Sequence, residues 1–407
     1  MKYEIKSIAW IQTIFAPMID ANSTTIEIVC KAGSIYETRD NNGISHFLEH
    51  LFFKGGKKYP TSKDVAEAVD KFGGEFNAYT GDEYAGYYVK CAPEFISKAI
   101  DVLGDMMIHP AFPKEELERE KGVVIQELKM YEDNPIALVM QKWQEYYFWD
   151  NSYGRATIWT EANIKSFNQE KLLAHQADLY AKDNLIIVIA GKIADEAALS
   201  KQLEETFGTL PTEKRISKPP FVQTLPTDKV AFYDKKTEQN HLIISAPGFA
   251  GDDEQRYAAS VLATILGGNM SSRLFQNIRA KQGLCYYIKA QHMSTQDTGM
   301  FLIRAGIDKG RFDFGLEKIF EEIARIANGD ITQEEFDNAI GYNEGQIQMG
   351  IESSDEMASF LGGQFLIYNK VETLEEILKK YKALKLADIQ AIASKLSREN
   401  CFLYYIK

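Results

Sequence analysis

The sequence has few cysteines, no long apolar run and no secretory signal. Cys30, Cys91, Cys285 and Cys401 lie far apart and form no C-x-x-C pair, so neither a disulfide framework nor a thiolate zinc site is indicated. No apolar stretch approaches the roughly 18 residues that a membrane-spanning helix needs. The start, "MKYEIKSIAWIQTIF", lacks a basic segment followed by an apolar core and a small-residue cleavage site, so we expect a cytoplasmic protein.

Basic residues are also in deficit, because 46 lysines and arginines face 58 acidic residues and give a net charge of −12. Nucleic-acid binding needs a clustered basic surface, so we expect no nucleic-acid partner and rather a basic or neutral ligand. A hydrophobic content of 45% excludes a disordered chain. The 407 residues suit two domains of about 200 residues each.

A proline-rich segment divides the chain. "LPTEKRISKPPFVQTLPTDK", from Leu210, holds four of the eleven prolines. We therefore predict an N-terminal domain over residues 1–210, a linker over 211–229 and a C-terminal domain over 230–407.

The two halves resemble degenerate copies of one unit. "KDNLIIVIAG", from Lys182, corresponds to "RENCFLYYIK", from Arg398, and "AGYYVKCAPEFISKAIDVLGDMM", from Ala85, corresponds to "GMFLIRAGIDKGRFDFGLEKIFEEI", from Gly299. Each half is predicted to contain strands, a helix, a hairpin, long helices and a final strand. This is an α+β fold with helices packed on a mostly antiparallel sheet.

The stretch "GISHFLEHLFFKGG" contains His46 and His50, two of only six histidines, around Glu49. Residues four apart share one face of a helix, so both imidazoles can reach a single ion, with Glu49 on an adjacent line. In the second half the aligned positions hold Ala258, Val261 and Leu262, so the structural role alone requires no polar residue there. Alternatively, His46 and His50 bind no metal, and one of them takes part in a hydrogen-bond network while the other is exposed to solvent.

A zinc ion held by two histidines needs a third protein ligand and an open position for water. A helix predicted from Pro113 to about Tyr131 has a seam at spacings of 3, 4, 3 and 4 that carries Glu120 and Glu127. Carboxylates on such a seam imply a cation or a donor network. Alternatively, both face a solvated groove and pair with Lys or Arg.

"HFLEH", followed after 76 residues by Glu127 and then by "YEDNP", resembles the pitrilysin-type inverzincins. The chain is similar to their short bacterial members and to the catalytic subunit of mitochondrial processing peptidase. The resemblance covers essentially the whole chain, including "GGEFNAYTGDEYAGYY" and "LGGNMSSRLFQNIRAKQGLCYY". It implies two homologous α/β-roll domains that form one half of a peptidase clamshell.

The resemblance assigns roles to individual residues. It implies one zinc per chain, held by His46, His50 and Glu127. It further implies Glu49 as the general base and Glu120 as the residue that holds a ligand histidine in place.

The resemblance also suggests how a substrate binds. "GGEFNAYTGDEYAGYYVK", from Gly73, predicts a hairpin whose first strand would be a free edge that adds the substrate backbone as another strand. Asn77, Ala78 and Tyr79 are the candidates for main-chain contacts, unless this edge is an ordinary covered one.

In the second half, "RAKQGLCY" places Arg279 and Tyr286 seven residues apart. The resemblance assigns these two donors to a substrate carbonyl or an oxyanion. Spacing favours Tyr286 over the adjacent Tyr287, and without the resemblance the pair would read as a surface arginine and a packed aromatic.

The expected function is that of a zinc-dependent endopeptidase that cuts unfolded or extended peptides. A non-catalytic scaffold subunit of the same fold and a metal-binding peptide chaperone are the alternatives. The resemblance implies a homodimer with composite active sites, in which Arg279 and Tyr286 serve the zinc site of the partner chain.

Overall fold

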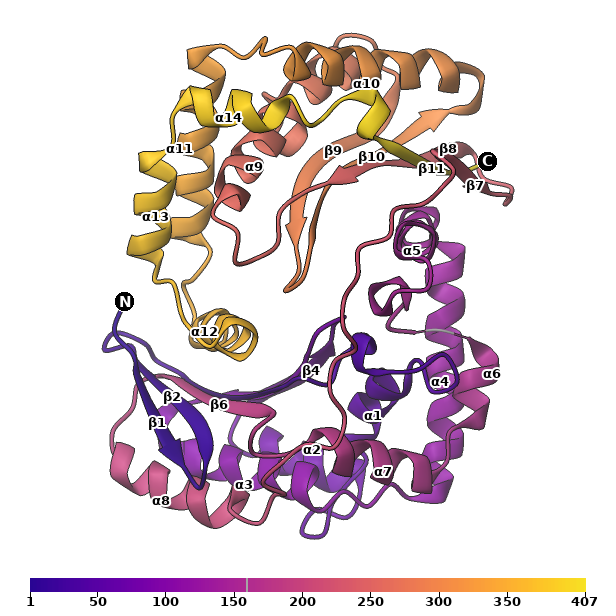
Figure 1. Cartoon of the computed structure of the whole chain (residues 1–407). Coiled ribbons are helices and arrows are strands. Elements are labelled where there is room, and N and C mark those ends of the chain that lie inside the picture. The colour runs from indigo at the N-terminus through magenta and orange to yellow at the C-terminus, as the bar shows by residue number, and fades with distance from the viewer. Residues whose placement is uncertain (159) are drawn as a thin grey trace. The chain divides into compact units, whose positions relative to one another are not determined.

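The computed structural model describes residues 1–158 and 160–407 and contains two packing units (Figure 1). Unit 1 comprises Met1–Lys129, Arg155–Pro220 and Gly350–Val371, and unit 2 comprises Met130–Gly154, Phe221–Met349 and Glu372–Lys407. Within the described residues, no helix combines the length and the apolar character that crossing a bilayer requires.

Unit 1 is built on a six-stranded sheet, sheet A, in the order β1-β2-β6-β3-β5-β4. Only β2 and β6 run parallel; the other neighbours are antiparallel. The strands are β1 (Glu4–Ile8), β2 (Ile11–Pro17), β3 (Thr24–Cys30), β4 (Glu75–Thr80), β5 (Ala85–Cys91) and β6 (Leu185–Gly191).

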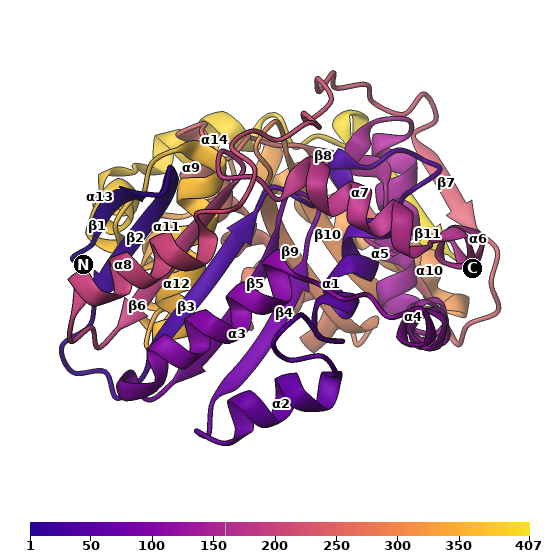
Figure 2. The same cartoon turned by 90° about the horizontal axis from the view of Figure 1, so that it is seen from below.

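Helices lie on both faces of sheet A. Helix α12 covers one face, and α3 and α8 lie against the opposite face (Figures 1 and 2). The helices of unit 1 are α1 (Ile44–Phe52), α2 (Ser62–Asp70), α3 (Ile96–Ile108), most of α4 (Lys114–Asp133), α6 (Glu161–Ser166), α7 (Gln169–Leu179), α8 (Glu196–Phe207) and α12 (Ser354–Tyr368).

Unit 2 is built on a five-stranded sheet, sheet B, in the order β7-β11-β8-β10-β9. Its strands are β7 (Val230–Tyr233), β8 (Gln239–Pro247), β9 (Cys285–Ser294), β10 (Gly299–Asp308) and β11 (Phe402–Ile406). Its helices are α5 (Pro135–Phe148), α9 (Gln255–Ala263), α10 (Phe312–Ala327), α11 (Gln333–Met349), α13 (Leu374–Ala383) and α14 (Leu386–Ala393), with π-helical turns at Thr264–Gly268 and Phe275–Ala280.

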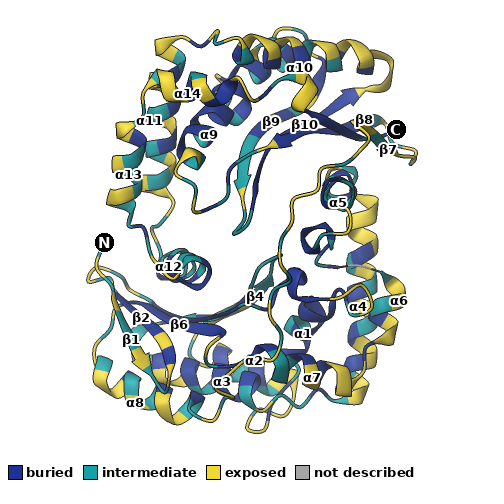
Figure 3. Cartoon of the chain, in the orientation of Figure 1, coloured by how far each residue is buried: buried dark blue, intermediate teal, exposed yellow. Residues whose placement is uncertain are grey.

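The two sheets repeat one topology. The order β2-β6-β3-β5-β4 in sheet A corresponds strand by strand to β7-β11-β8-β10-β9 in sheet B, and the single parallel pair occupies the same position in both. Figure 3 shows that the central strands of both sheets are buried while the outer faces of the helices are exposed. The predicted α+β fold with mostly antiparallel sheets is confirmed.

Each packing unit contains a helix from the opposite half of the sequence. Helix α5 packs on β8 and β11, where the indole Nε1 of Trp143 donates to Ser245 Oγ at 2.9 Å. Helix α12 packs on β3 and β6, and a Cβ at Gly362 would come within 2.9 Å of Val29 Cγ2. Residues 211–229 form no helix or strand. The predicted domain boundary at residues 211–229 stays a prediction about where the sequence repeats. The packing units do not follow it, because each contains one helix from the other half of the sequence.

A buried carboxylate attaches α12 to sheet A. Glu27, in the middle of β3, has no exposed surface. Its Oε1 accepts a hydrogen bond from Tyr79 Oη at 2.8 Å and its Oε2 accepts one from Ser359 Oγ of α12 at 2.9 Å. Burial raises the pKa of Glu27 to about 7, although the hydrogen bonds from Tyr79 and Ser359 lower it in part.

We expect a Glu27→Gln variant to lose part of the pH dependence of folding stability. The folded state holds the Glu27 proton more tightly than the unfolded chain does, so the free energy of unfolding falls as the pH rises from about 4.5 toward 7. Between about pH 5 and about pH 8, the free energy of unfolding should fall on this account by on the order of 2 to 3 kcal/mol. Urea unfolding of chelator-treated protein at about pH 5 and about pH 8 measures it.

At the higher pH the Glu27→Gln variant should be more stable than the wild type. Glu118→Gln, at an exposed position of α4, is the matched control and should keep the wild-type pH dependence. If the free energy of unfolding of Glu27→Gln fell with rising pH as steeply as that of the wild type, a raised pKa at Glu27 would be contradicted.

Candidate metal centre

Helix α1, which carries His46 and His50, begins at a fixed backbone position. Its N-cap, Gly43, has φ of 94°, a left-handed conformation that glycine adopts without strain. The buried carboxylate of Glu37 accepts hydrogen bonds from the backbone N–H of Gly43 at 2.7 Å and of Ser45 at 2.8 Å. A carboxyl group that accepts hydrogen bonds at a helix N-terminus satisfies otherwise unpaired amides, and here it fixes the direction of α1.

The side chains of His46, His50 and Glu127 converge. One ligand atom from each lies within 4.8 Å of the others. His46 Nε2 is 3.7 Å from Glu127 Oε1, and His50 Nε2 is 3.4 Å from Glu127 Oε2. Ligand atoms on one tetrahedral zinc ion are about 3.4 Å apart, given bonds of about 2.0 to 2.2 Å. The three side chains therefore already have nearly the separation that a shared ion requires.

A chain of polar contacts continues behind His50. Its Nδ1 is 2.9 Å from Glu120 Oε1, and the other oxygen of Glu120 is 2.7 Å from Lys54 Nζ. When His50 is neutral and its Nδ1–H donates to Glu120, the lone pair lies on Nε2, the ring nitrogen nearer Glu127, and can bind a metal. Glu120 is buried, so Lys54 and His50 together offset the cost of burying its charge.

The pKa values of the two histidines diverge. Burial and the neighbouring His50 lower the pKa of His46 to about 4, so its imidazole is neutral near pH 7. Burial also disfavours charge on His50, but its hydrogen bonds to Glu120 and Glu127 outweigh burial and raise its pKa to about 9. The hydrogen bond to His50 lowers the pKa of Glu127 against burial. Two anionic carboxylates therefore favour positive charge at this cluster.

This donor set fits zinc. Two imidazoles and one carboxylate are a set that catalytic zinc sites use, with a remaining position for water. His46 Nδ1 is buried and has no hydrogen-bond partner among the described residues, so the ring is left to act through Nε2, the atom nearest Glu127.

Glu49 lies on α1 between the two histidines, and its ligand atoms are not part of the three-residue cluster. Its Oε2 accepts a short hydrogen bond from Thr80 Oγ1, at the end of β4. Burial raises the pKa of Glu49 above its ordinary value. A half-buried carboxylate with a raised pKa is a stronger base than an exposed one.

The predicted hairpin is present, and β4 is an edge strand of sheet A that pairs, among the described residues, with β5 alone. Asn77, Ala78 and Tyr79 all belong to β4. The backbone N–H of Ala78 donates to the side-chain oxygen Oδ1 of Asn77 at 2.9 Å.

Arg279 and Tyr286 lie close together in unit 2, since the guanidinium carbon of Arg279 is 5.9 Å from the Tyr286 ring centroid. Tyr286 is 76% exposed. The hydroxyl of Tyr287 is instead 3.0 Å from His241 Nδ1. Of the two tyrosines, Tyr286 therefore has the accessible side chain.

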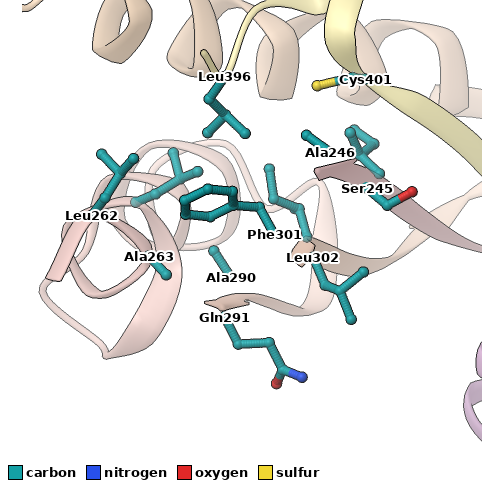
Figure 4. A pocket seen from close by; sticks show the side chains of 13 residues that line it. Ser245, Ala246, Leu262, Ala263, Ala290, Gln291, Phe301, Leu302, Leu396 and Cys401 are labelled. Atoms are coloured by element: carbon teal, nitrogen blue, oxygen red, sulfur yellow. The ribbon is translucent and has the colours of Figure 1, made fainter. Parts of the chain in front are cut away.

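The second half shows what the same framework contains without metal ligands. Ala258 and Leu262, aligned with the two histidines, are buried core residues of α9. Leu262 lines an apolar cavity of about 10 Å³ together with Phe301 and Leu396 (Figure 4). A space of this size holds about one water and offers no chemistry.

Sequence reasoning missed several residues around the cluster and misjudged part of a seam. The acid Glu37 and the hydroxyl of Thr80 carry no signal in a single sequence, because their partners lie 8 and 31 positions away. Lys54 follows His50 by four positions, a spacing that could have indicated it. The buried face of α4 continues from Val124 to Leu128, four positions on, and does not include Tyr131, which is 41% exposed.

Two family models match the chain. The model described as Insulinase (Peptidase family M16) matches residues 18–161, which include all residues of the cluster. The model described as Peptidase M16 inactive domain matches residues 166–341.

Similar proteins extend over nearly the whole chain. An uncharacterized zinc protease of Bacillus subtilis (YmxG) is 36% identical over 387 residues, covering 94% of this chain and 93% of the relative. An uncharacterized zinc protease of Rickettsia bellii is 34% identical over 379 residues, 92% of this chain and 90% of the relative. The solved structure of a protease from Helicobacter pylori has the same fold, with a TM-score of 0.91 at 21% identity over 100% of this chain and 99% of that one.

Proposed function

The chain belongs to peptidase family M16, and on this premise we propose that it is a zinc-dependent endopeptidase that hydrolyses peptide bonds in unfolded or extended peptides. The observation that supports this most is the convergence of His46, His50 and Glu127 within 4.8 Å, with Glu49 on the same helix as the two histidines but outside the cluster.

His46 and His50 would bind one zinc ion through Nε2, and Glu127 through a carboxylate oxygen. When bound, zinc lowers the pKa of a water molecule and polarises the scissile carbonyl. Glu120 would accept a hydrogen bond from His50 Nδ1–H, which fixes the tautomer of the ring and makes Nε2 a stronger metal ligand.

Glu49 would take a proton from the attacking water and later give it to the leaving amine. Burial raises the pKa of Glu49, which makes the ionised carboxylate a stronger base toward that water. Arg279 and Tyr286 are proposed as donors to the substrate carbonyl oxygen, where negative charge develops. The exposed side chain of Tyr286 supports this choice over Tyr287.

An extended substrate would pair with β4. This edge strand has a free side for main-chain hydrogen bonds, and we assign the contacts to Asn77, Ala78 and Tyr79. Recognition through the backbone tolerates many sequences, and the net charge of −12 favours basic peptides.

The direct test is to incubate the zinc-loaded protein with an unfolded basic peptide and to identify fragments by mass spectrometry. We expect internal cleavage that a chelator stops. Peptide binding without fragments would indicate a chaperone, and a folded protein that takes up no zinc would indicate a scaffold subunit.

Replacing Glu120 by Gln should weaken zinc binding without abolishing it. The change removes the anionic partner of His50 Nδ1 and leaves Lys54 without its ion pair, and changes of this kind typically cost about 10- to 100-fold in metal affinity. Competition with a fluorescent zinc chelator measures this affinity. Glu118→Gln, on the exposed side of the same helix, is the control, and equal affinities in both variants would contradict the role of Glu120.

We further propose a homodimer in which Arg279 and Tyr286 of one chain complete the site of the other. Mixing Glu49→Gln protein with Tyr286→Phe protein then produces mixed dimers with one doubly defective site and one intact site. At random pairing, activity should rise toward about a quarter of the wild-type value. No recovery despite demonstrated subunit exchange would exclude shared sites and leave the zinc assignment untouched.

A further inference from the structure

The hydroxyl of Thr80 links the candidate general base to the edge strand. Thr80 is the last residue of β4, and its Oγ1 donates to Oε2 of Glu49 on α1. Side chains alternate along a strand, so Ala78 and Thr80 face α1 while Tyr79 faces the opposite side, where it reaches Glu27.

This contact distinguishes the two oxygens of Glu49. Oε2 is engaged by Thr80, whereas Oε1 has no hydrogen-bond partner among the described residues. A glutamate side chain has three rotatable bonds and loses considerable freedom when it is fixed. Threonine is a suitable restraint, because its branched Cβ limits rotation about χ1 and its strand backbone is already paired with β5.

We propose that Thr80 is a positioning residue that holds the Glu49 carboxylate with Oε1 directed to the attacking water. This inference rests on the proposed peptidase function and adds a residue that acts through the base. Because Thr80 directly follows Tyr79 in the strand, pairing of a substrate with β4 would order the strand end and the base together.

The test compares Thr80→Val, which keeps the shape and removes the hydroxyl, with Thr80→Ser, which keeps the hydroxyl. We expect kcat to fall about 10- to 100-fold in Thr80→Val, the effect of losing a hydrogen bond to a charged group. KM for the peptide and zinc affinity should change less than about twofold. Thr80→Ser should recover kcat to within about threefold of the wild type.

Thr25→Val is the matched control, because Thr25 is also on a strand of sheet A and donates to or accepts from Ser354 of α12, away from the base. Its kcat should equal that of the wild type. If Thr80→Val does not fold, Thr80→Ala replaces it, with thermal unfolding as the check of folding.

Several outcomes would overturn the inference. These are an unchanged kcat in Thr80→Val, equal losses in the Val and Ser variants, or a rise in KM alone, which would mean that Thr80 only supports the edge strand. Failure of the proposed function is distinguishable, because in that case the wild-type protein itself cleaves nothing.

Discussion

Glu49→Gln protein is expected to bind zinc as the wild type does and to lose nearly all hydrolysis. Glu49 lies outside the three-residue cluster, so removing its charge takes no ligand away. Loss of a general base typically lowers kcat by about 10²- to 10⁴-fold. Glutamine keeps the size of the side chain and can still accept from Thr80, so the local structure should persist.

The measurement pairs zinc content by atomic absorption with kcat on the basic peptide. Glu118→Gln, at an exposed position of α4, is the control for loss of one negative charge and should behave as wild type in both assays. Loss of zinc from Glu49→Gln would contradict its assignment as a base, since a base that does not bind the metal can be removed without releasing it.

Replacing a residue of the cluster by alanine should remove zinc and activity together. His50→Ala leaves Glu127 and Glu120 without their shared imidazole, and Glu127→Ala leaves two imidazoles, which hold zinc poorly without a third ligand. The loss of zinc affinity should be larger than the about 10- to 100-fold that is typical when a residue hydrogen-bonded to a ligand, such as Glu120, is replaced.

Equilibrium zinc titration of each variant measures this effect, with circular dichroism to verify folding. His109→Ala, at an exposed histidine outside the cluster, and Glu118→Ala on α4 should keep full zinc binding. A Glu127→Ala variant that retains stoichiometric zinc would show that another residue is the third ligand.

The sequence was sufficient for local features and for the fold class. The i, i+4 spacing of His46 and His50 and the hairpin pattern depend on neighbours along the chain, and the last strand was found by comparing the two halves of the sequence. The corresponding elements α1, β4 and β11 are present. Glu127 lies 77 positions beyond His50, so helical periodicity could put it on a seam but could not say which helix the seam would face.

Contacts between distant segments could not be predicted in this way. Glu37 and Thr80 act on α1 from a loop and from a strand end, and their positions depend on how the chain folds back. The exchange of α5 and α12 was not foreseen either, because both helices have apolar residues that either sheet could bury.

The exchange of helices constrains how the chain can fold during synthesis. The face of sheet A that includes Val29 and Val188 is covered by α12, which begins at Ser354, 163 positions after β6 ends at Gly191. At about 5 to 20 residues per second, this apolar face stays uncovered for roughly 10 to 30 s after its last strand has been made. A fragment that ends in the proline-rich segment would keep it uncovered permanently and would expose an aggregation-prone surface. During synthesis, the α12-facing side of sheet A is therefore open to unwanted association until the second half of the chain has been made.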